Sequence, residues 1–365
     1  MRNGQLTQET IGQHRLVSQQ IASPTFSDPG EVVRWLGAVQ AQDYLAALWA
    51  VGLRTVGATE QVLERALAER RIVRTWPMRG TIHFVAPVDV RWMLELLTPR
   101  VVQRSQSRLR QLGLDAATLT ASAQVVTRAL EGGRRLTRPA LYRALAADGI
   151  AADGARGLHI LGQLAQARLI CFGPHDGKQP TFVLLDEWVP PAPALSRDEA
   201  LATLALRYFT SHGPATVHDF VWWSGLTVAE AKAGLGAVAA QLAHATLDGQ
   251  TYYWADEDAP NAGDEAGGFL LPSFDEFLVG YRDRSAVLDP ARTTAVVPGG
   301  NGMFNPIAVS SSRVVGTWKR VIKPRHVVVA FSPFAPWSDS QVQAFQAAAE
   351  RYGRFLGLPV VVEAR

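Results

Sequence analysis

The sequence predicts an α+β fold: three tandem winged helix-turn-helix units followed by a C-terminal α+β lobe. At 365 residues, the chain is longer than one ordinary hydrophobic core requires. Short helical stretches, a longer helical stretch and a β-hairpin follow one another in the same order three times. After the acidic, glycine-rich stretch NAGDEAGG, the pattern changes to strand-like pieces around one long helix. We therefore expect four domains, with boundaries at 1–97, 98–195, 196–265 and 266–365.

The first unit shows this order only loosely. Helices are expected around 11–21, 31–38 and 59–70, and the stretch RIVRTWPMRGTIHFVAP then reads as a hairpin.

The second unit shows the order clearly. LTRPALYRALAADGI predicts a short helix, and RGLHILGQLAQARLI repeats leucine at close to helical spacing. The β-rich runs RLICFG and QPTFVLL follow, joined by PHDGK, a turn sequence. This order of elements is typical of a winged helix.

The third unit repeats the order with stronger local signals. SHGPATVHDFVWWSGL predicts a short helix that ends at Gly225, a residue suited to a C-cap. TVAEAKAGLGAVAAQL begins with a threonine cap and an acidic first turn. In ATLDGQTYYWA, Asp-Gly between two strand-like halves predicts a tight hairpin.

The C-terminal lobe is expected to be mostly strand. FLLPSFDEFLVGYRDR, TTAVVPGG, NPIAVSSSRVVGTWKR and HVVVAF read as strand-like pieces. SDSQVQAFQAAAERYGRFLG predicts a helix with a serine cap, and PVVVEA a closing strand.

Composition describes a folded globular protein, because 47% of residues are hydrophobic and 19% are charged. The single cysteine, Cys171, excludes an intramolecular disulfide and fits a reducing compartment. The start of the chain is polar and lacks the apolar core of a signal peptide. No run approaches the roughly 18 apolar residues of a membrane span. A soluble, cytoplasmic protein without membrane contact is expected.

Charge is unevenly placed although the net charge is only +3. Residues 54–138 hold fifteen Arg, no Lys and seven acids, a local charge of +8, whereas 256–276 hold seven acids and no base. This asymmetry suggests a surface that faces a polyanion such as nucleic acid. The alternative is an arginine-rich, solvated face. Arginine's planar fork suits phosphate oxygens and guanine edges.

Familiar catalytic motifs are absent. The eight histidines form no HExxH and no zinc spacing with cysteine, and His212 and His218 read as ordinary side chains near a turn. GxGxxG, GxxxxGK[ST] and GxSxG are missing, so no metal and no cofactor is predicted. The acid pair Asp275–Glu276 fits general acid–base work or, more commonly, capping and arginine binding. No lysine looks placed for a Schiff base, Lys319 being the least unsuitable.

Two glutamines, Gln40 and Gln42, interrupt the largely apolar stretch AVQAQDYLAALWAV. On a helix their amides would lie about 200° apart, on opposite faces. In an extended segment they would point to the same side. Because Gly37 is suited to end the preceding helix, we expect an extended or irregular connector with both amides facing one cavity. From the residues alone, a purely structural role for the amides is favoured.

Several segments in order resemble one family. They are RWLGAVQAQDYLAALWAVGLR, TWPMRGTIHFVAPVDVRWM, WVPP, GPATVHDFVWWSGL, LPSFDEFLVGYRDRS and VVGTWKR. Together they are similar to the bacterial winged-helix DNA glycosylases of the AlkZ and YcaQ type, which unhook interstrand crosslinks. The resemblance covers nearly the whole chain. The motif Gln-aliphatic-Gln ends in Gln42 and not in Asp, which looks like the AlkZ branch.

The resemblance implies a monofunctional DNA glycosylase that hydrolyses the N-glycosidic bond of N7-alkylated purines, including crosslinked ones. Gln40 and Gln42 would be the catalytic pair that orients water, with Asp43 as an auxiliary group or as the base itself. The implied partner is double-stranded DNA that contains alkylated or crosslinked bases, met by a monomer at the nucleoid. Self-resistance to a DNA-crosslinking antibiotic is the implied role of the AlkZ branch.

Candidate DNA-binding residues come from the same landmarks: Arg34, Arg79, Thr81, His83, Lys319 and Arg320. Arg79, Thr81 and His83 are expected to alternate onto one face of the first hairpin, close to the glutamines. The equal alternative is a buried structural network.

Two other classes of function stay open from the residues. A non-catalytic winged-helix regulator would show a strongly basic recognition helix in each unit, whereas the long helix of the third unit has one Lys and one Glu. A protein scaffold without nucleic acid would not need the arginine-rich first half.

Overall fold

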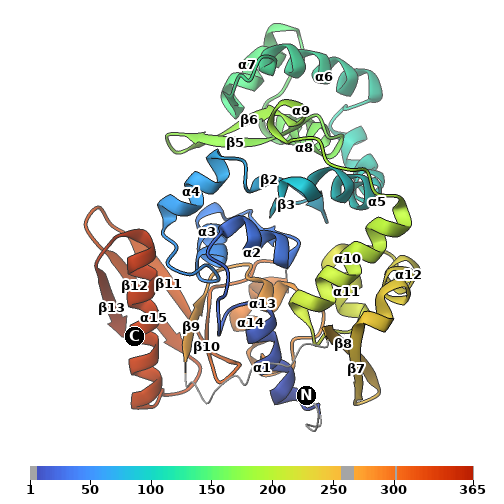
Figure 1. Cartoon of the computed structure of the whole chain (residues 1–365). Helices are drawn as coiled ribbons and strands as arrows, with labels where there is room; N and C mark the ends of the chain where they lie inside the picture. Colours follow the sequence, from blue (N-terminus) through green and yellow to red (C-terminus); the bar gives the residue numbers. More distant parts are fainter. Residues whose placement is uncertain (1–5, 256–266, 301, 365) are drawn as a thin grey trace. The chain divides into compact units, whose positions relative to one another are not determined.

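The computed structural model describes residues 6–255, 267–300 and 302–364. The chain divides into two compact units, coloured by sequence in Figure 1. Unit 1 comprises Met1–Leu63 and Leu201–Arg365, and unit 2 comprises Glu64–Ala200. Both units combine runs of helices with largely antiparallel sheets, which confirms the predicted α+β class.

The N-terminal part of unit 1 is helical. It contains α1 (Gln8–Ser18), α2 (Pro29–Leu36), the two-residue strand β1 (Val39–Gln40), α3 (Tyr44–Gly52) and the start of α4 (Glu60–Ala68). A capping box at Thr7 starts α1, and the Asp28 carboxylate caps α2. Helices α1, α2 and α4 confirm the three helices expected in this part of the chain, whereas α3 was not expected.

The third predicted winged helix lies in the second part of unit 1. It consists of α10 (Arg197–His212), α11 (Val217–Ser224), α12 (Val228–Val238), β7 (Leu242–Leu247) and β8 (Gln250–Ala255). Gly225 ends α11 with a φ of 76°, and Thr227 starts α12 with a capping box. Asp248 and Gly249 both have positive φ in the two-residue turn of the hairpin. The local signals of this unit are all confirmed.

The C-terminal lobe is built around a five-stranded sheet in the order β13-β12-β11-β10-β9. Its elements are β9 (Gly268–Leu271), α13 (Glu276–Val279), α14 (Thr293–Val296), β10 (Ile307–Ser310), β11 (Arg313–Ile322), β12 (Val327–Pro333), α15 (Asp339–Leu356) and β13 (Val360–Ala364). Only the pair β12–β13 is parallel. Helix α15 lies along this sheet (Figure 1), and its Tyr352 ring meets Trp318 of β11 edge to face at 5.3 Å.

Two strand-like pieces of this lobe are helical turns, which corrects the expectation for them. DEFLV forms α13 because the Asp275 carboxylate caps it by accepting from Phe277 N. TTAV forms α14 because a 3-10 turn at Pro290–Arg292, capped by Asp289, leads directly into it. In both places a local cap outweighs the β-propensity of Val, Phe and Thr.

Unit 2 holds the first and second predicted hairpins in one antiparallel sheet, in the order β3-β2-β5-β6-β4. Its elements are β2 (Val73–Met78), β3 (Thr81–Val85), α5 (Val90–Gln111), α6 (Ala116–Leu130), β4 (Leu136–Thr137), α7 (Arg138–Ala147), α8 (Gly154–Gln166), β5 (Ile170–Asp176), β6 (Gln179–Leu184) and α9 (Leu185–Trp188). An apolar cluster that includes Val126, Leu141 and Ile160 fills its core. The helices and hairpins expected here are confirmed.

The four expected domains do not coincide with the two compact units. Residues 1–97 are divided between the units after Leu63, and position 97 lies inside α5. The expected boundary after residue 195 lies close to the end of unit 2 at Ala200. The boundary after residue 265 lies outside the described residues. The division into four domains stays a prediction.

Candidate active site

The segment that carries the two glutamines is extended, as expected. Helix α2 ends at Gly37, β1 contains Gln40, and Asp43 caps the next helix, α3. Gln40 is half-buried, and Gln42 is exposed. The Gln40 Nε2 donates to Gln42 Oε1 at 3.4 Å, so the two amides approach each other on one side of the segment.

Glycine at position 37 allows the backbone to turn from α2 into β1. Gly37 has a φ of 79°, a conformation that side chains rarely adopt. A Cβ at this position would also lie 3.2 Å from Arg207 Cδ and 3.4 Å from Trp223 Cη2. The tight exit from α2 turns the chain into β1 and thereby sets the direction of Gln40.

Helix α3 ties the far end of the segment to the C-terminal lobe. Trp49 Nε1 donates to the main-chain oxygen of Leu270 at 2.7 Å, and the Trp49 ring contacts those of Tyr352 and Phe355 at 5.1 Å. Because Trp49 is only 3% exposed, this anchor is part of the core.

Asp43 has structural partners at both carboxylate oxygens. Its Oδ1 caps α3 by accepting from Ala46 N at 3.1 Å and lies 3.6 Å from Arg320 Nη2. Its Oδ2 accepts from Ser273 Oγ at 3.0 Å. Its side chain is nevertheless 43% exposed. This set of contacts holds Asp43 in place beside the two amides.

Lys319 and Arg320 point to opposite faces of β11. Arg320 shares a face with Trp318, which is buried, and its guanidinium lies near Asp43 and 5.9 Å from the centre of the Tyr352 ring. Burial raises the pKa of Tyr352 to about 12, although the Arg320 charge opposes this. Lys319 is exposed on the other face. Only Arg320 therefore belongs to the surroundings of the glutamine segment.

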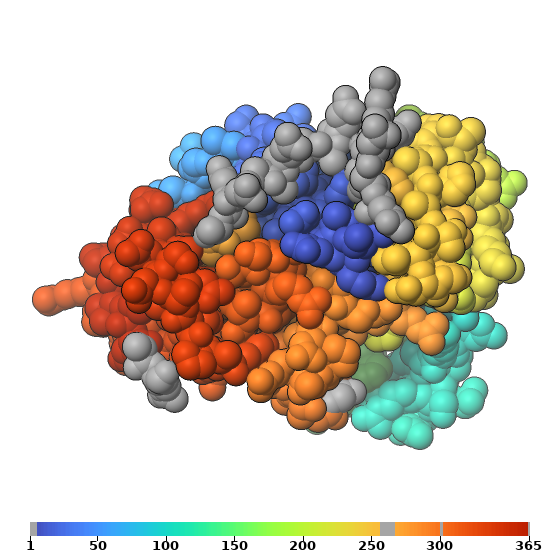
Figure 2. Space-filling model, turned by 90° about the horizontal axis from the view of Figure 1, so that it is seen from below, coloured from blue at the N-terminus to red at the C-terminus, as the bar shows by residue number. Residues whose placement is uncertain are grey.

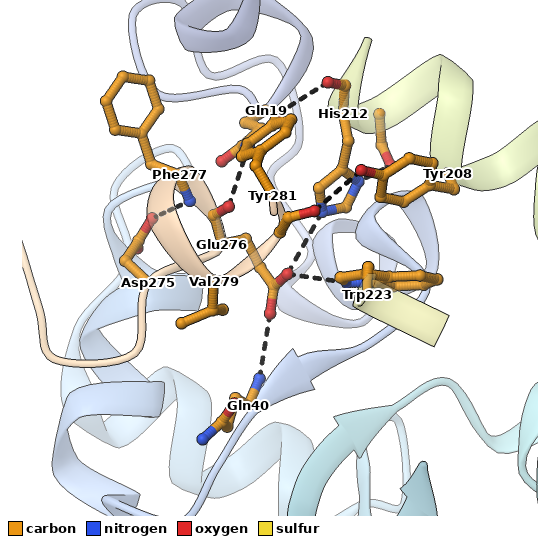
Figure 3. Close-up of polar contacts among 12 residues, drawn as sticks. Gln19, Gln40, Tyr208, His212, Trp223, Asp275, Glu276, Phe277, Val279 and Tyr281 are labelled. Atoms are coloured by element: carbon orange, nitrogen blue, oxygen red, sulfur yellow. Dashed lines mark hydrogen bonds and ion pairs between the residues drawn. The ribbon is translucent and has the colours of Figure 1, made fainter. Parts of the chain in front are cut away.

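A buried carboxylate, Glu276, lies behind Gln40 (Figure 3). Its Oε1 accepts from the main-chain N–H of Gln40 at 3.4 Å. Its Oε2 accepts from Trp223 Nε1 at 2.9 Å and lies 3.3 Å from His212 Nε2. Glu276 is 0% exposed. Burial lowers the pKa of His212, although its contact with Glu276 opposes this.

Asp275 caps a helix and binds an arginine, which is the commoner of the two roles considered for the acid pair. It caps α13 and forms a two-pronged ion pair with the buried Arg54, with both N–O distances at 2.8 Å. Arg54 also donates to the main chain of Gln19 and Ala50, and to the Gln19 side chain. These contacts fix the start of α13, and hence Glu276, in the core.

Helix α1 packs against the core that surrounds Glu276. In Figure 2 it lies, in dark blue, between the yellow third winged helix and the orange C-terminal lobe. Its Arg15 donates to Pro214 O at 3.0 Å and stacks on the Tyr281 ring at 3.6 Å. Tyr281 in turn donates to His212 O at 2.7 Å. The elements around Glu276 thus come from both sequence segments of unit 1.

In unit 2, Arg79, Thr81 and His83 form a local network. Arg79 and Gly80 make the two-residue turn of the β2–β3 hairpin, with φ values of 54° and 74°. Arg79 therefore lies in a turn and not on the strand face expected for it. His83 Nδ1 lies 3.0 Å from Thr81 O, which can only accept, so Nε2 accepts from Arg79 Nη2 at 3.3 Å.

Burial and the Arg79 charge lower the pKa of His83 well below its usual value, and the ring is 0% exposed. His83 therefore lies in a buried network with Arg79 and Thr81, and the expected contact of these residues with DNA stays a prediction. The expected proximity of these residues to the glutamines stays a prediction.

Arg34 is exposed on α2 and borders a surface cavity of about 410 Å³ in unit 1. Arg207, Trp35 and Phe26 also line this cavity. A cation beside aromatic rings fits the expected contact with nucleic acid, and that contact stays a prediction.

Other sequence expectations can be compared with the described residues. Cys171 is buried in β5, and burial raises the pKa of its thiol, so this side chain is part of the core. Within residues 6–255, 267–300 and 302–364, no group of three or more His, Cys, Asp or Glu side chains is arranged to hold a metal ion. In the same residues, no helix has the length and apolar character needed to cross a bilayer.

Comparison with known proteins identifies the class of this chain as a DNA glycosylase. The family model described as "DNA glycosylase AlkZ-like" matches residues 33–355. The chain therefore belongs to the AlkZ-like DNA glycosylase family, and the resemblance and the enzyme class inferred from the sequence are confirmed.

Two similar proteins come from Streptomyces sahachiroi. A curated relative described as an interstrand DNA cross-link repair glycosylase is 27% identical over 361 residues, covering 94% of this chain and 95% of the relative. The solved structure of the S. sahachiroi DNA glycosylase AlkZ is similar with a TM-score of 0.78 and 26% identity. That match covers 99% of this chain and all of the other.

Sequence reasoning did not find the group behind Gln40. Glu276 was considered only as half of an acid pair, and His212 and Trp223 were not connected with the glutamines. These residues lie at least 172 positions from Gln40, and no local pattern links them. The only available signal was that FDEF and VWWS both fall within family landmarks.

Proposed function

We propose that this protein hydrolyses the N-glycosidic bond of N7-alkylated purines in double-stranded DNA, including purines that take part in interstrand crosslinks. The observation that carries the proposal is the pair of amides at Gln40 and Gln42, held 3.4 Å apart on an extended segment with Gln42 exposed. The family of the chain and the name of its curated relative support the same assignment.

The chemistry suits neutral amides. Alkylation at N7 makes the purine cationic, so the base is a good leaving group and its departure needs little acid catalysis. The remaining tasks are to orient a water molecule and to stabilise positive charge that develops on the sugar. An amide oxygen can accept a hydrogen bond from water and can direct its dipole toward that charge. Because an amide is a negligible base, unmodified guanine should be a poor substrate.

The two amides are suited to act as one group. Gln42 Oε1 accepts from Gln40 Nε2 with one lone pair, and its second lone pair can accept from water. Asp43 is an auxiliary residue in this proposal, because its oxygens already contact Ala46, Ser273 and Arg320. Its negative charge next to the amides adds to the stabilisation of a cationic sugar.

The experiment measures base release under single-turnover conditions, from a duplex with N7-methylguanine and from a duplex with an N7-linked crosslink. Gln40→Ala and Gln42→Ala should each lower the rate by about 100- to 1000-fold, the usual loss for one well-placed electrostatic contact. The double variant should lose less than the product of the two, because both amides act on one water molecule. DNA affinity and thermal stability should stay close to those of the wild type.

Asp43→Asn tests the role of the neighbouring carboxylate, since asparagine also caps helices but carries no charge. We expect a smaller rate loss than for either glutamine. If Asp43→Asn is far slower than the glutamine variants, Asp43 is the base and the glutamines orient it. A wild-type protein that releases no alkylated base would refute the proposed function, and activity that falls only in proportion to folded protein would refute the role of the amides.

A further inference from the structure

We propose that Glu276 is a positioning residue for this reaction: its buried carboxylate fixes the main chain of Gln40 and thereby the direction of the Gln40 amide. The inference rests on the proposed function, and it extends that function to a residue 236 positions away in the sequence.

Glu276 is an unusual group to keep in a core. It is 0% exposed, and no arginine or lysine contacts it among the residues that the structure describes. The two other acids of this core do have arginine partners, since Asp275 pairs with Arg54 and Asp219 lies 4.0 Å from Arg15. Burying a carboxylate is costly unless hydrogen bonds or cations compensate. Hydrogen bonds from N–H groups therefore compensate for the burial of the Glu276 carboxylate.

The two oxygens of Glu276 have separate tasks. Oε2 faces Trp223 Nε1 and His212 Nε2, which are buried side chains of α11 and α10. Oε1 faces the main-chain N–H of Gln40. One oxygen thus anchors the carboxylate to the third winged helix, while the other holds the glutamine segment (Figure 3).

The main chain of Glu276 is held equally firmly. It follows Asp275, whose carboxylate binds Arg54 and caps α13, and its own carbonyl oxygen accepts from Gln19 Nε2 at 3.4 Å. Because both the main chain and the side chain of Glu276 are fixed in the core, its hydrogen bond restricts the movement of Gln40.

The position of Gln40 depends on how its short strand is held. Gln40 lies in a strand of two residues, between the tight exit at Gly37 and the bend before Asp43. Catalytic groups have to be held within about 0.5 Å of the productive geometry. A displacement of about 1 Å can lower a rate by about 100-fold.

The test uses Glu276→Gln in the full-length protein. A glutamine side chain can keep its oxygen toward Trp223 and His212, but it then turns an NH2 group toward the Gln40 N–H, where two donors repel. We expect the single-turnover rate of N7-methylguanine release to fall about 10- to 100-fold, as it does when a group that orients a catalytic side chain is removed. The Kd for the same duplex should change less than about twofold, because Glu276 is buried and contacts no DNA.

Asp219→Asn is the matched control. It is also a change of a buried acid to its amide, and Asp219 lies in the same core, where it caps α11 and contacts neither Gln40 nor Glu276. We expect it to lower the melting temperature while the rate per folded molecule stays the same. An equal rate loss in both variants would show that general loosening of the core, and not Glu276, is responsible.

A double-mutant cycle with Gln40→Ala decides between positioning and simple stabilisation. If Glu276 acts through Gln40, Glu276→Gln should change the rate less than about twofold in the Gln40→Ala background. The same fold-loss in both backgrounds overturns the proposal, as does an unchanged rate in a folded Glu276→Gln protein.

If Glu276→Gln does not fold, Trp223→Phe takes its place in the cycle, because it removes one of the two contacts of Oε2 while the charge remains. It should slow the reaction several-fold, and only when Gln40 is present. An inactive wild-type protein would refute the proposed function and this inference together, whereas an active wild-type protein with additive variants would refute the inference alone.

Discussion

Replacing Arg54 by methionine should destabilise unit 1 strongly. Arg54 is 0% exposed and makes five hydrogen bonds of 2.8–3.0 Å. Methionine fills much of the space but leaves Asp275 as a buried charge without its cation. It also leaves acceptors on Gln19 and Ala50 without this donor. Breaking a buried ion pair from one side typically costs about 3–5 kcal/mol.

The consequence can be measured by thermal and urea unfolding. For a unit of about 150–250 residues, each kcal/mol shifts Tm by about 2–4 °C, so Arg54→Met should lower Tm by about 6–20 °C. This is a large part of the roughly 5–15 kcal/mol that stabilises a typical domain. Calorimetry, or fluorescence of the buried tryptophans, would follow the transition.

The double variant Arg54→Met with Asp275→Asn tests the reason for the loss. Asparagine keeps the cap on α13 but removes the buried charge. The double variant should therefore be more stable than Arg54→Met alone. An Arg54→Met loss below about 1 kcal/mol, or a double variant as unstable as the sum of the two single variants, would refute this account of the core.

Three further predictions concern pH, product and DNA binding. Burial and Arg79 lower the pKa of His83, so the unfolded chain binds this proton at higher pH than the folded chain does. The stability of unit 2 should therefore fall as pH drops below about 6.5, and His83→Gln should flatten the dependence in urea titrations at several pH values. Borohydride should trap no protein–DNA adduct, because the proposed direct hydrolysis forms no imine with a lysine; an adduct that disappears with Lys319→Ala would contradict this. Affinity for unmodified duplex should fall steeply with salt concentration, as expected for phosphate contacts, and a titration without a slope would exclude an electrostatic mode of binding.

Elements with complete local signals could be predicted from the sequence. The capping box at Thr227, the C-cap at Gly225 and the Asp-Gly turn of the β7–β8 hairpin each need only neighbouring residues. The extended path of Gln40 and Gln42 was predictable for the same reason, since Gly37 ends the preceding helix. In each case the cap or turn residue fixes the backbone before any tertiary contact forms.

Elements that depend on distant contacts could not be predicted in this way. The ion pair between Asp275 and Arg54, 221 residues earlier, has no signal in the stretch FDEF, although the Asp275 cap of α13 is local. The arginine-rich region was interpreted as a surface for polyanions, yet Arg54 is buried against an acid and Arg79 contacts a histidine. Charge counting gives the sign of a region, but it does not show which arginines are already paired.

The support of Gln40 by Glu276 also has a consequence for the order in which the chain is made. Unit 1 consists of two stretches separated by the whole of unit 2, so the glutamine segment leaves the ribosome 236 residues before the carboxylate that holds it. At about 5–20 residues per second, that interval lasts about 12–47 s. Unit 2 is completed within it and can fold first. During this time the apolar faces of α1 to α3, within the first 63 residues, are not yet covered by the second stretch of unit 1. A chaperone that binds apolar helices of nascent chains would bind this protein at that stage of synthesis.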